Sequence, residues 1–214
     1  MKNMLGLAFQ AASDQFITMS MAQVLVIPMT RPIFETEVAN RMYSISAYYL
    51  AQVVAGFAVF FLYPMFTTVI SYWWLGLENQ DWNGMFDWMG VLCVPALLGA
   101  LWGFTLGTFF RDNMKALSFN FVFLNIFNMG AGVTVNISSG VGWVPWLISY
   151  ISPIRYGTEM LISRVLQNKP YAKPVMISLG YTLGDEKCLM AAAIISVILF
   201  FTGWLNLIRT NQRD

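Results

Sequence analysis

The segment from residue 45 to residue 75 contains no Asp, Glu, Lys or Arg. About 20 apolar residues are enough for a helix to cross a hydrocarbon core of about 30 Å. This segment is longer than one perpendicular crossing requires, so the helix should tilt, protrude or bend. Pro64 favours a bend because it removes one helical donor. The segment predicts a transmembrane helix.

Four further apolar runs, at 5–30, 88–110, 115–136 and 188–208, bring the predicted spans to five. The chain is 57% hydrophobic and 11% charged, against roughly 25% charged residues in a soluble domain. We therefore expect an all-α polytopic integral membrane protein with one membrane domain over residues 1–214. No cleavable signal is evident, so the first helix should be retained. Plasma membrane and organelle membranes both fit this composition.

The residue inventory argues against several classes of site. Histidine is absent, and two cysteines, Cys93 and Cys188, cannot by themselves make a zinc or iron-sulfur site. We expect no catalytic residues and no metal site. A net charge of +1 without clustered Lys and Arg gives no footprint for nucleic acid.

A charged elbow separates the first two predicted spans at residues 31–43. It carries Arg31, Glu35, Glu37 and Arg41. Such charges are costly in lipid, so they predict a solvent-exposed turn on which another part of an assembly can act. The 111–115 turn and the carboxyl-terminal tail are also basic, which places all three segments on one side of the membrane.

The long segment 137–187 lies between the last two predicted spans. Its glycines, prolines and tryptophans indicate a re-entrant or interfacial structure rather than a free loop; they are Gly140, Gly142, Trp143, Pro145, Trp146 and Pro153. A short amphipathic helix is expected near 154–168.

Two motifs resemble the membrane domain of G-subfamily ABC exporters of the White and pleiotropic-drug-resistance type. The first is Ile33-Phe34-Glu35-Thr36-Glu37 followed by Met42-Tyr43 and Ala47-Tyr48, and the second runs from Trp146 to Tyr156. The resemblance extends over about residues 4–208. It implies that Glu35, Glu37, Arg41 and Tyr43 form a coupling elbow that transmits nucleotide-driven motion. Thr36 stands where the family has Arg, which weakens the transfer of an Arg-mediated relay.

The same resemblance implies partners. Members of the family bind ATP through a glycine-rich loop, but no GxxxxGK[ST] sequence occurs here. The chain also begins where the family's second helix begins. We therefore expect no cofactor in this chain, with ATP and Mg²⁺ held by a nucleotide-binding partner. A second membrane domain, identical or different, would complete the transporter.

The fourth predicted span supplies candidates for a substrate pathway. Asn125 and Asn128 lie three residues apart and can share one helix face. Because an intramembrane amide needs a partner, that face should meet a cavity or another helix. Phe121 could shape an apolar cavity there, although ordinary packing also explains it. In the preceding span, the row Gly99, Gly103 and Gly107 predicts a close helix or subunit contact.

Three charged residues allow a structural and a functional interpretation. Asp14 is an acid inside an apolar run, which makes it a functional candidate. Alternatively, the helix begins near Gln15 and Asp14 caps it, and this second interpretation is favoured. Arg155 and Glu159 have i, i+4 spacing and are expected to pair.

Two functions remain open. The first is a transport subunit for lipids or other hydrophobic molecules, with ATP hydrolysis by another chain. The second is a transporter-derived, transport-inactive subunit of a larger membrane assembly. An ion channel is a weaker third option because no charged ring or filter sequence is recognisable.

Overall fold

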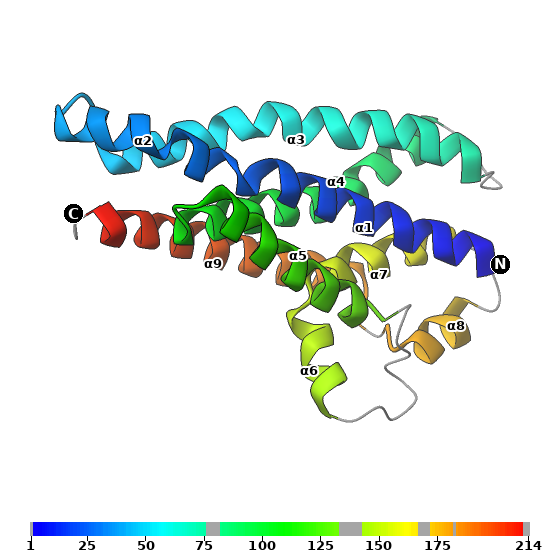
Figure 1. Ribbon diagram of the computed structural model, residues 1–214. Helices are drawn as coiled ribbons and strands as arrows, with labels where there is room; N and C mark the ends of the chain where they lie inside the picture. The colour runs from blue at the N-terminus through cyan, green and yellow to red at the C-terminus, as the bar shows by residue number, and fades with distance from the viewer. Residues whose placement is uncertain (1, 76–81, 133–142, 167–171, 182, 212–214) are drawn as a thin grey trace.

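The computed structural model describes residues 2–75, 82–132, 143–166, 172–181 and 183–211, and the described residues form helices without any strand (Figure 1). The helices are α1 Lys2–Val24, α2 Val26–Ala39, α3 Ile45–Leu75, α4 Trp82–Phe109, α5 Asn113–Gly130, α6 Trp143–Ile151, α7 Pro153–Val165, α8 Ala172–Leu179 and α9 Asp185–Asn211. Long helices lie side by side, and α6 projects from one flank (Figure 1).

Four helical stretches are long and apolar enough to cross a membrane: Leu5–Ala39, Ile45–Trp73, Trp82–Phe109 and Asp185–Thr210. The protein is an all-α polytopic membrane protein. Helix α3 has the bounds predicted from its uncharged sequence, and α1 and α2 together extend beyond the predicted 5–30.

Helix α5 is where the prediction of five spans needs correction. The predicted run 115–136 becomes an 18-residue helix that ends at Gly130, and it is not among the four apolar stretches of the described residues. Residues 133–136 lie outside the described part. Polar side chains such as Asn120, Asn125 and Asn128 lower its hydropathy. Helix α4 nevertheless ends on the side of the bundle where the α2–α3 turn lies, and α9 begins away from that side. The segment from α5 to α7 therefore returns the chain from one side of the bundle toward the other (Figure 1).

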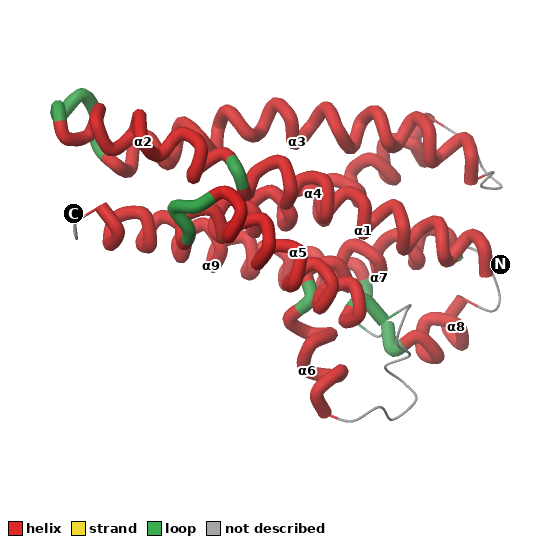
Figure 2. The backbone as a smooth tube through the Cα atoms, in the orientation of Figure 1, coloured by secondary structure: helices red, strands yellow, loops and turns green. Residues whose placement is uncertain are grey.

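The turns at one end of the bundle agree with the orientation predicted from charge. The turn between α2 and α3, the turn between α4 and α5 and the carboxyl terminus all lie at the left-hand end of Figure 2. These are the three segments whose basic residues predicted the orientation, so a single side of the membrane can receive all three.

Helices α1 and α4 make the closest contact in the bundle along the predicted glycine row. A Cβ atom on Gly103 would lie 2.3 Å from the carbonyl oxygen of Ser20, and one on Gly99 would lie 2.3 Å from that of Phe16. Only residues without a side chain permit two helix backbones to approach so closely. The row therefore serves a contact between helices of this chain.

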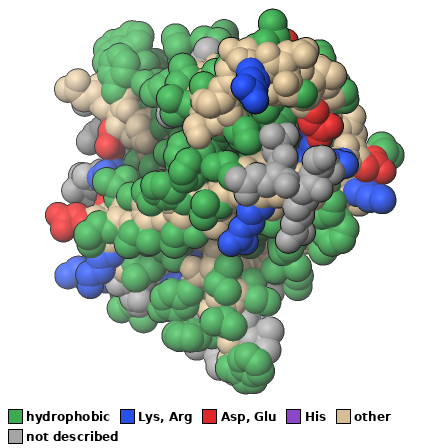
Figure 3. All heavy atoms as spheres, turned by 90° about the vertical axis from the view of Figure 1, so that its left-hand side faces the viewer, with side chains coloured by type: hydrophobic (Ala, Val, Ile, Leu, Met, Phe, Trp, Pro, Cys, Tyr) green, Lys and Arg blue, Asp and Glu red, His purple; other side chains and the backbone are tan. Residues whose placement is uncertain are grey.

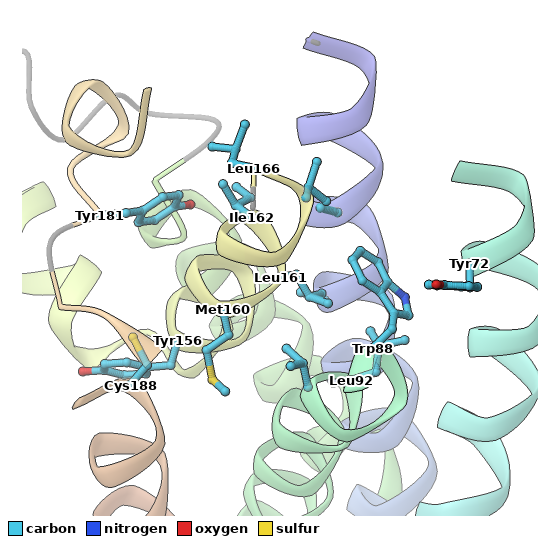
Figure 4. Close-up of a cluster of buried hydrophobic side chains, with 14 residues drawn as sticks. Tyr72, Trp88, Leu92, Tyr156, Met160, Leu161, Ile162, Leu166, Tyr181 and Cys188 are labelled. Atoms are coloured by element: carbon cyan, nitrogen blue, oxygen red, sulfur yellow. The ribbon is translucent and has the colours of Figure 1, made fainter. Parts of the chain in front are cut away.

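Helix α7 is the centre of the outer segment, and it turns back into the bundle after α6. It packs against α1, α4 and α9, and Figure 4 shows Leu161 beside Trp88 and Leu92 of α4, with Ile162 on the side toward Leu166. The expected helix near 154–168 is present, but it is buried on almost every side rather than amphipathic. Cys188 of α9 lies in the same cluster with no exposed surface, which leaves it inaccessible to a thiol of another subunit.

The predicted Arg155–Glu159 pair does not form. Arg155 is 1% exposed, and its guanidinium donates to the carbonyl oxygen of Gly180 at 3.0 Å and to the hydroxyl of Ser149. It also lies 4.4 Å from the ring centroid of Tyr150. These interactions hold the side chain of Arg155 away from Glu159, which lies one turn further along the helix.

Glu159 instead binds the turn that precedes α9. Its Oε1 accepts from the backbone N–H groups of Leu183, at 2.7 Å, and Gly184, at 3.1 Å. The side chain is fully buried, so these hydrogen bonds offset part of the cost of removing a carboxylate from water. Arg155 and Glu159 together fix the approach of the chain to the last span.

Asp14 lies well inside α1, which begins at Lys2. The favoured interpretation, that Asp14 caps a helix starting near Gln15, is therefore wrong. The carboxylate lies in the first third of an apolar stretch, Leu5–Ala39, that is long enough to span a membrane.

Candidate functional site

The elbow differs from the solvent-exposed turn predicted for residues 31–43. Helix α2 continues α1 almost without interruption and ends only at Ala39. Arg31 is 5% exposed, because it lies on the inner face of α2 with Glu35 one turn further along. The exposed residues of the elbow lie along the outer face of α2, at Pro32, Ile33 and Thr36, and at its tip, where Arg41 lies.

Glu35 connects the elbow to the turn between α4 and α5. Its Oε1 lies 3.0 Å from Arg31 Nε and 3.5 Å from Arg111 Nη2. Figure 3 looks onto this end of the molecule, where acidic and basic side chains are scattered among hydrophobic ones. Partly exposed ion pairs contribute only about 0–1 kcal/mol, so Glu35 orients these two segments more than it stabilises them.

Glu37 bonds across the turn to the start of α3. The hydroxyl of Tyr43 donates to Glu37 Oε2 at 2.5 Å. Burial, this hydrogen bond and the carboxylate charge raise the pKa of Tyr43 to about 12. Glu37 and Arg41 have the i, i+4 spacing of a pair on a surface helix. That pair is not among the ion pairs of the described residues, since α2 ends before Arg41, whose φ is 56°. The hydrogen bond between the Tyr43 phenol and the Glu37 carboxylate therefore connects the end of α2 to the start of α3.

An aromatic cluster that the sequence did not single out supports this bond. Tyr43 stacks on Tyr48 with ring centroids 6.1 Å apart, and Phe34 lies 4.2 Å from Tyr48. The hydroxyls of Thr30 and Tyr48 are 2.5 Å apart. An open groove of about 450 Å³ runs along these residues and Glu37. The aromatic residues on the two sides of the turn, Phe34 before it and Tyr43 and Tyr48 at and after its end, were the signal that could have found it.

The predicted pathway residues of α5 do not form one cluster. Phe121 and Asn125 are exposed, and Asn125 Nδ2 donates to the carbonyl oxygen of Phe121 at 2.8 Å. Asn128 instead faces α1 and accepts from the hydroxyl of Ser13 at 3.1 Å. The two amides therefore meet different surroundings, despite their three-residue spacing.

A second polar contact between α1 and α5 was missed. Asn120 is fully buried, and its Oδ1 accepts from Ser20 Oγ at 2.8 Å and from Trp102 Nε1 at 3.1 Å. Together with the Ser13–Asn128 bond it forms a polar seam between two antiparallel helices. The serines are two turns apart on α1, as the asparagines are on α5, and that matched spacing was the available signal.

Residues 1–166 match the family model described as ABC-2 type transporter. The chain belongs to this family. Its relatives are G-family ABC transporters. They include the ABC transporter ATP-binding protein/permease wht-1 of Caenorhabditis elegans, 25% identical over 73% of this chain. Protein brown of Drosophila virilis is 30% identical over 73% of this chain. ABC transporter G family member 25 of Arabidopsis thaliana is 27% identical over 74%.

The matched region is only part of each relative. This chain covers 23% of the length of each of these three proteins. The comparison therefore shows an ABC-2 membrane domain in an integral, multi-pass membrane protein.

Proposed function

We propose that this chain is the membrane-spanning transport subunit of an ABC exporter of lipids or other hydrophobic molecules. ATP hydrolysis, with its Mg²⁺, is supplied by another chain. Two membrane domains, identical or different, face each other across the pathway. Family membership and the construction of the elbow support this proposal.

The observation that carries the proposal is the way the elbow joins the membrane helices. Helix α2 continues α1, Glu37 and Tyr43 connect α2 to the start of α3, and Glu35 reaches Arg111 before α5. A partner that displaced the elbow would therefore move the ends of α1, α3 and α5 together. Motion at one end of the bundle can reach a pathway inside the membrane in this way.

The pathway is assigned to the surface of α5 that has no partner helix in the described residues. Phe121 and Asn125 are exposed there, so a second membrane domain can cover them and enclose a space. Asn128 supports this surface from behind through its bond to Ser13. It would orient α5 rather than touch the transported molecule.

Purification of the native complex in mild detergent tests the proposal, with mass spectrometry of the associated chains and an ATPase assay. We expect an ATP-binding partner at fixed stoichiometry. In that complex Glu37→Ala should lower substrate-stimulated ATPase activity, whereas Glu186→Gln, in the first turn of α9, should not. Unchanged stimulation in Glu37→Ala would remove the coupling role. A large assembly without an ATP-binding partner would instead identify a transport-inactive structural subunit.

A further inference from the structure

A second candidate site lies between α1 and α3, away from the elbow and from the exposed surface of α5. It is a cavity of about 320 Å³, within the size range of small-molecule sites. Its polar lining comes from both helices: Gln10, Asp14 and Gln15 of α1, and Tyr63, Thr67 and Ser71 of α3. Apolar side chains complete the wall, and Leu7 and Ile70 are 49% and 60% exposed. The cavity therefore opens on an exposed apolar surface of the described helices.

The carboxylate in this cavity has no cationic partner among the described residues. Asp14 Oδ1 accepts from Gln10 Nε2 at 2.7 Å, and none of the recorded salt bridges includes Asp14. A neutral amide does not neutralise a carboxylate. Since a charge within a membrane-spanning stretch is costly and normally faces a partner or a polar cavity, a positively charged ligand would stabilise Asp14.

Gln15 provides a second acceptor at the same place. It is 1% exposed, and its Nε2 is used by a hydrogen bond to Thr67 Oγ1. Its carbonyl oxygen, Oε1, is buried and has no hydrogen-bond partner. A buried acceptor without a donor costs free energy until a ligand supplies one. The cavity thus has one charged acceptor, and one residue of its lining holds a buried neutral acceptor without a donor.

A protonated amine satisfies these requirements. An ammonium group carries a positive charge and three donors, and hydrogen bonds between ionised groups are the stronger class. The exposed Leu7 and Ile70 provide an apolar surface for a hydrocarbon chain that enters from the bilayer. We propose that the α1–α3 cavity binds the ammonium group of an amphiphilic molecule through Asp14 and Gln15.

The identification of this amphiphile as transported cargo rests on the proposed function, whereas the binding site itself does not. The probe is dodecylamine with a diazirine next to the head group, and the corresponding dodecanol is its neutral control. Each is cross-linked to the purified full chain in phosphatidylcholine nanodiscs, and peptides of α1 and α3 are quantified by mass spectrometry. We compare wild-type protein with Asp14→Asn and with the matched carboxylate control Glu186→Gln.

We expect the amine to label these peptides at a concentration about tenfold lower than the alcohol. Asp14→Asn should remove that preference and leave labelling by the alcohol unchanged, and Glu186→Gln should keep it. Equal labelling by amine and alcohol in the wild-type protein would overturn the site, and this comparison does not depend on a variant folding. Retention of the preference in Asp14→Asn would overturn it as well.

The cargo identification is tested separately in the assembled transporter. Stimulation of its ATPase activity by dodecylamine, lost in Asp14→Asn, is the expected result. An active ATPase that dodecylamine does not stimulate would overturn the cargo identification alone. Failure to find any ATPase partner would overturn the proposed function, while amine labelling in nanodiscs would still support the site.

Discussion

Replacement of Gly103 by Ala tests the contact that organises the bundle. The added Cβ would lie 2.3 Å from the carbonyl oxygen of Ser20 and 3.0 Å from its Cα. Carbon–oxygen contacts between helices ordinarily measure about 3.3–3.6 Å, so α1 and α4 would have to separate by about 1 Å. Overpacking of this kind costs about 1–3 kcal/mol.

The same helix supplies a matched control at Gly90. A Cβ on Gly90 would meet no atom within 4 Å. There Gly90→Ala should stabilise the helix by about 0.5–1 kcal/mol, because Gly loses more backbone freedom than Ala on folding. The two substitutions add the same atom to the same helix, so their difference isolates the close contact with α1.

Thermal unfolding in detergent, followed by circular dichroism, measures both variants. For a chain of this size 1 kcal/mol corresponds to about 2–4 °C in Tm. We expect Gly103→Ala to lower Tm by about 2–12 °C and Gly90→Ala to raise it by about 1–4 °C. Equal shifts in the two variants would show that α1 does not approach α4 as closely as described, and the reasoning would fail.

Three further predictions concern the outer turn, the elbow and the pathway. Glu159→Ala should cost about 1–3 kcal/mol because it leaves two turn amides unpaired; Glu159→Gln keeps an acceptor, so its Tm should fall less. Tyr43 should ionise near pH 12, since burial raises its pKa and the neutral phenol also donates to Glu37. This hydrogen bond should persist below pH 10 and be lost as pH rises through 12; the wild-type minus Tyr43→Phe ultraviolet difference spectrum, and a lower pKa in Glu37→Gln, check it. Asn125→Leu should change the substrate preference of the assembled transporter, and unaltered transport of every tested substrate would argue against a pathway at α5.

Helix positions could be predicted from the sequence where an uninterrupted apolar segment can enter lipid only as a helix, which pairs its own backbone N–H and C=O groups. Between residues 45 and 75 no charged side chain interrupts the apolar run, and α3 has those bounds. Helix α5 was harder because its amides lower the apparent hydrophobicity of a segment that still returns across the bundle. Asn120 and Asn128 bind serines of α1. A prediction from the hydropathy of one segment cannot take account of a partner that lies 100 residues away in the sequence.

Charged residues were predicted less well because spacing alone does not reveal competing partners. The i, i+4 rule describes Arg31 with Glu35, which lie in one helix and bond at 3.0 Å. It fails for Arg155 and Glu159, because backbone groups of the turn before α9 reach both side chains. It also fails for Arg41, which lies beyond the end of α2. Each failure depends on a loop position that periodicity does not specify.

Helix α1 connects the elbow with the cavity at Asp14. It packs far more extensively on α4, through the glycine row, than on α3. The polar bond of Gln15 to Thr67 and that of Thr18 to Tyr63, at 3.1 Å, are among its few links to α3. A displacement of the elbow moves the adjoining ends of α1 and α3 together. Further along, the sparse contacts between α1 and α3 should yield more readily than those of either helix with α4, and the volume of the cavity that contains Asp14 should change with them.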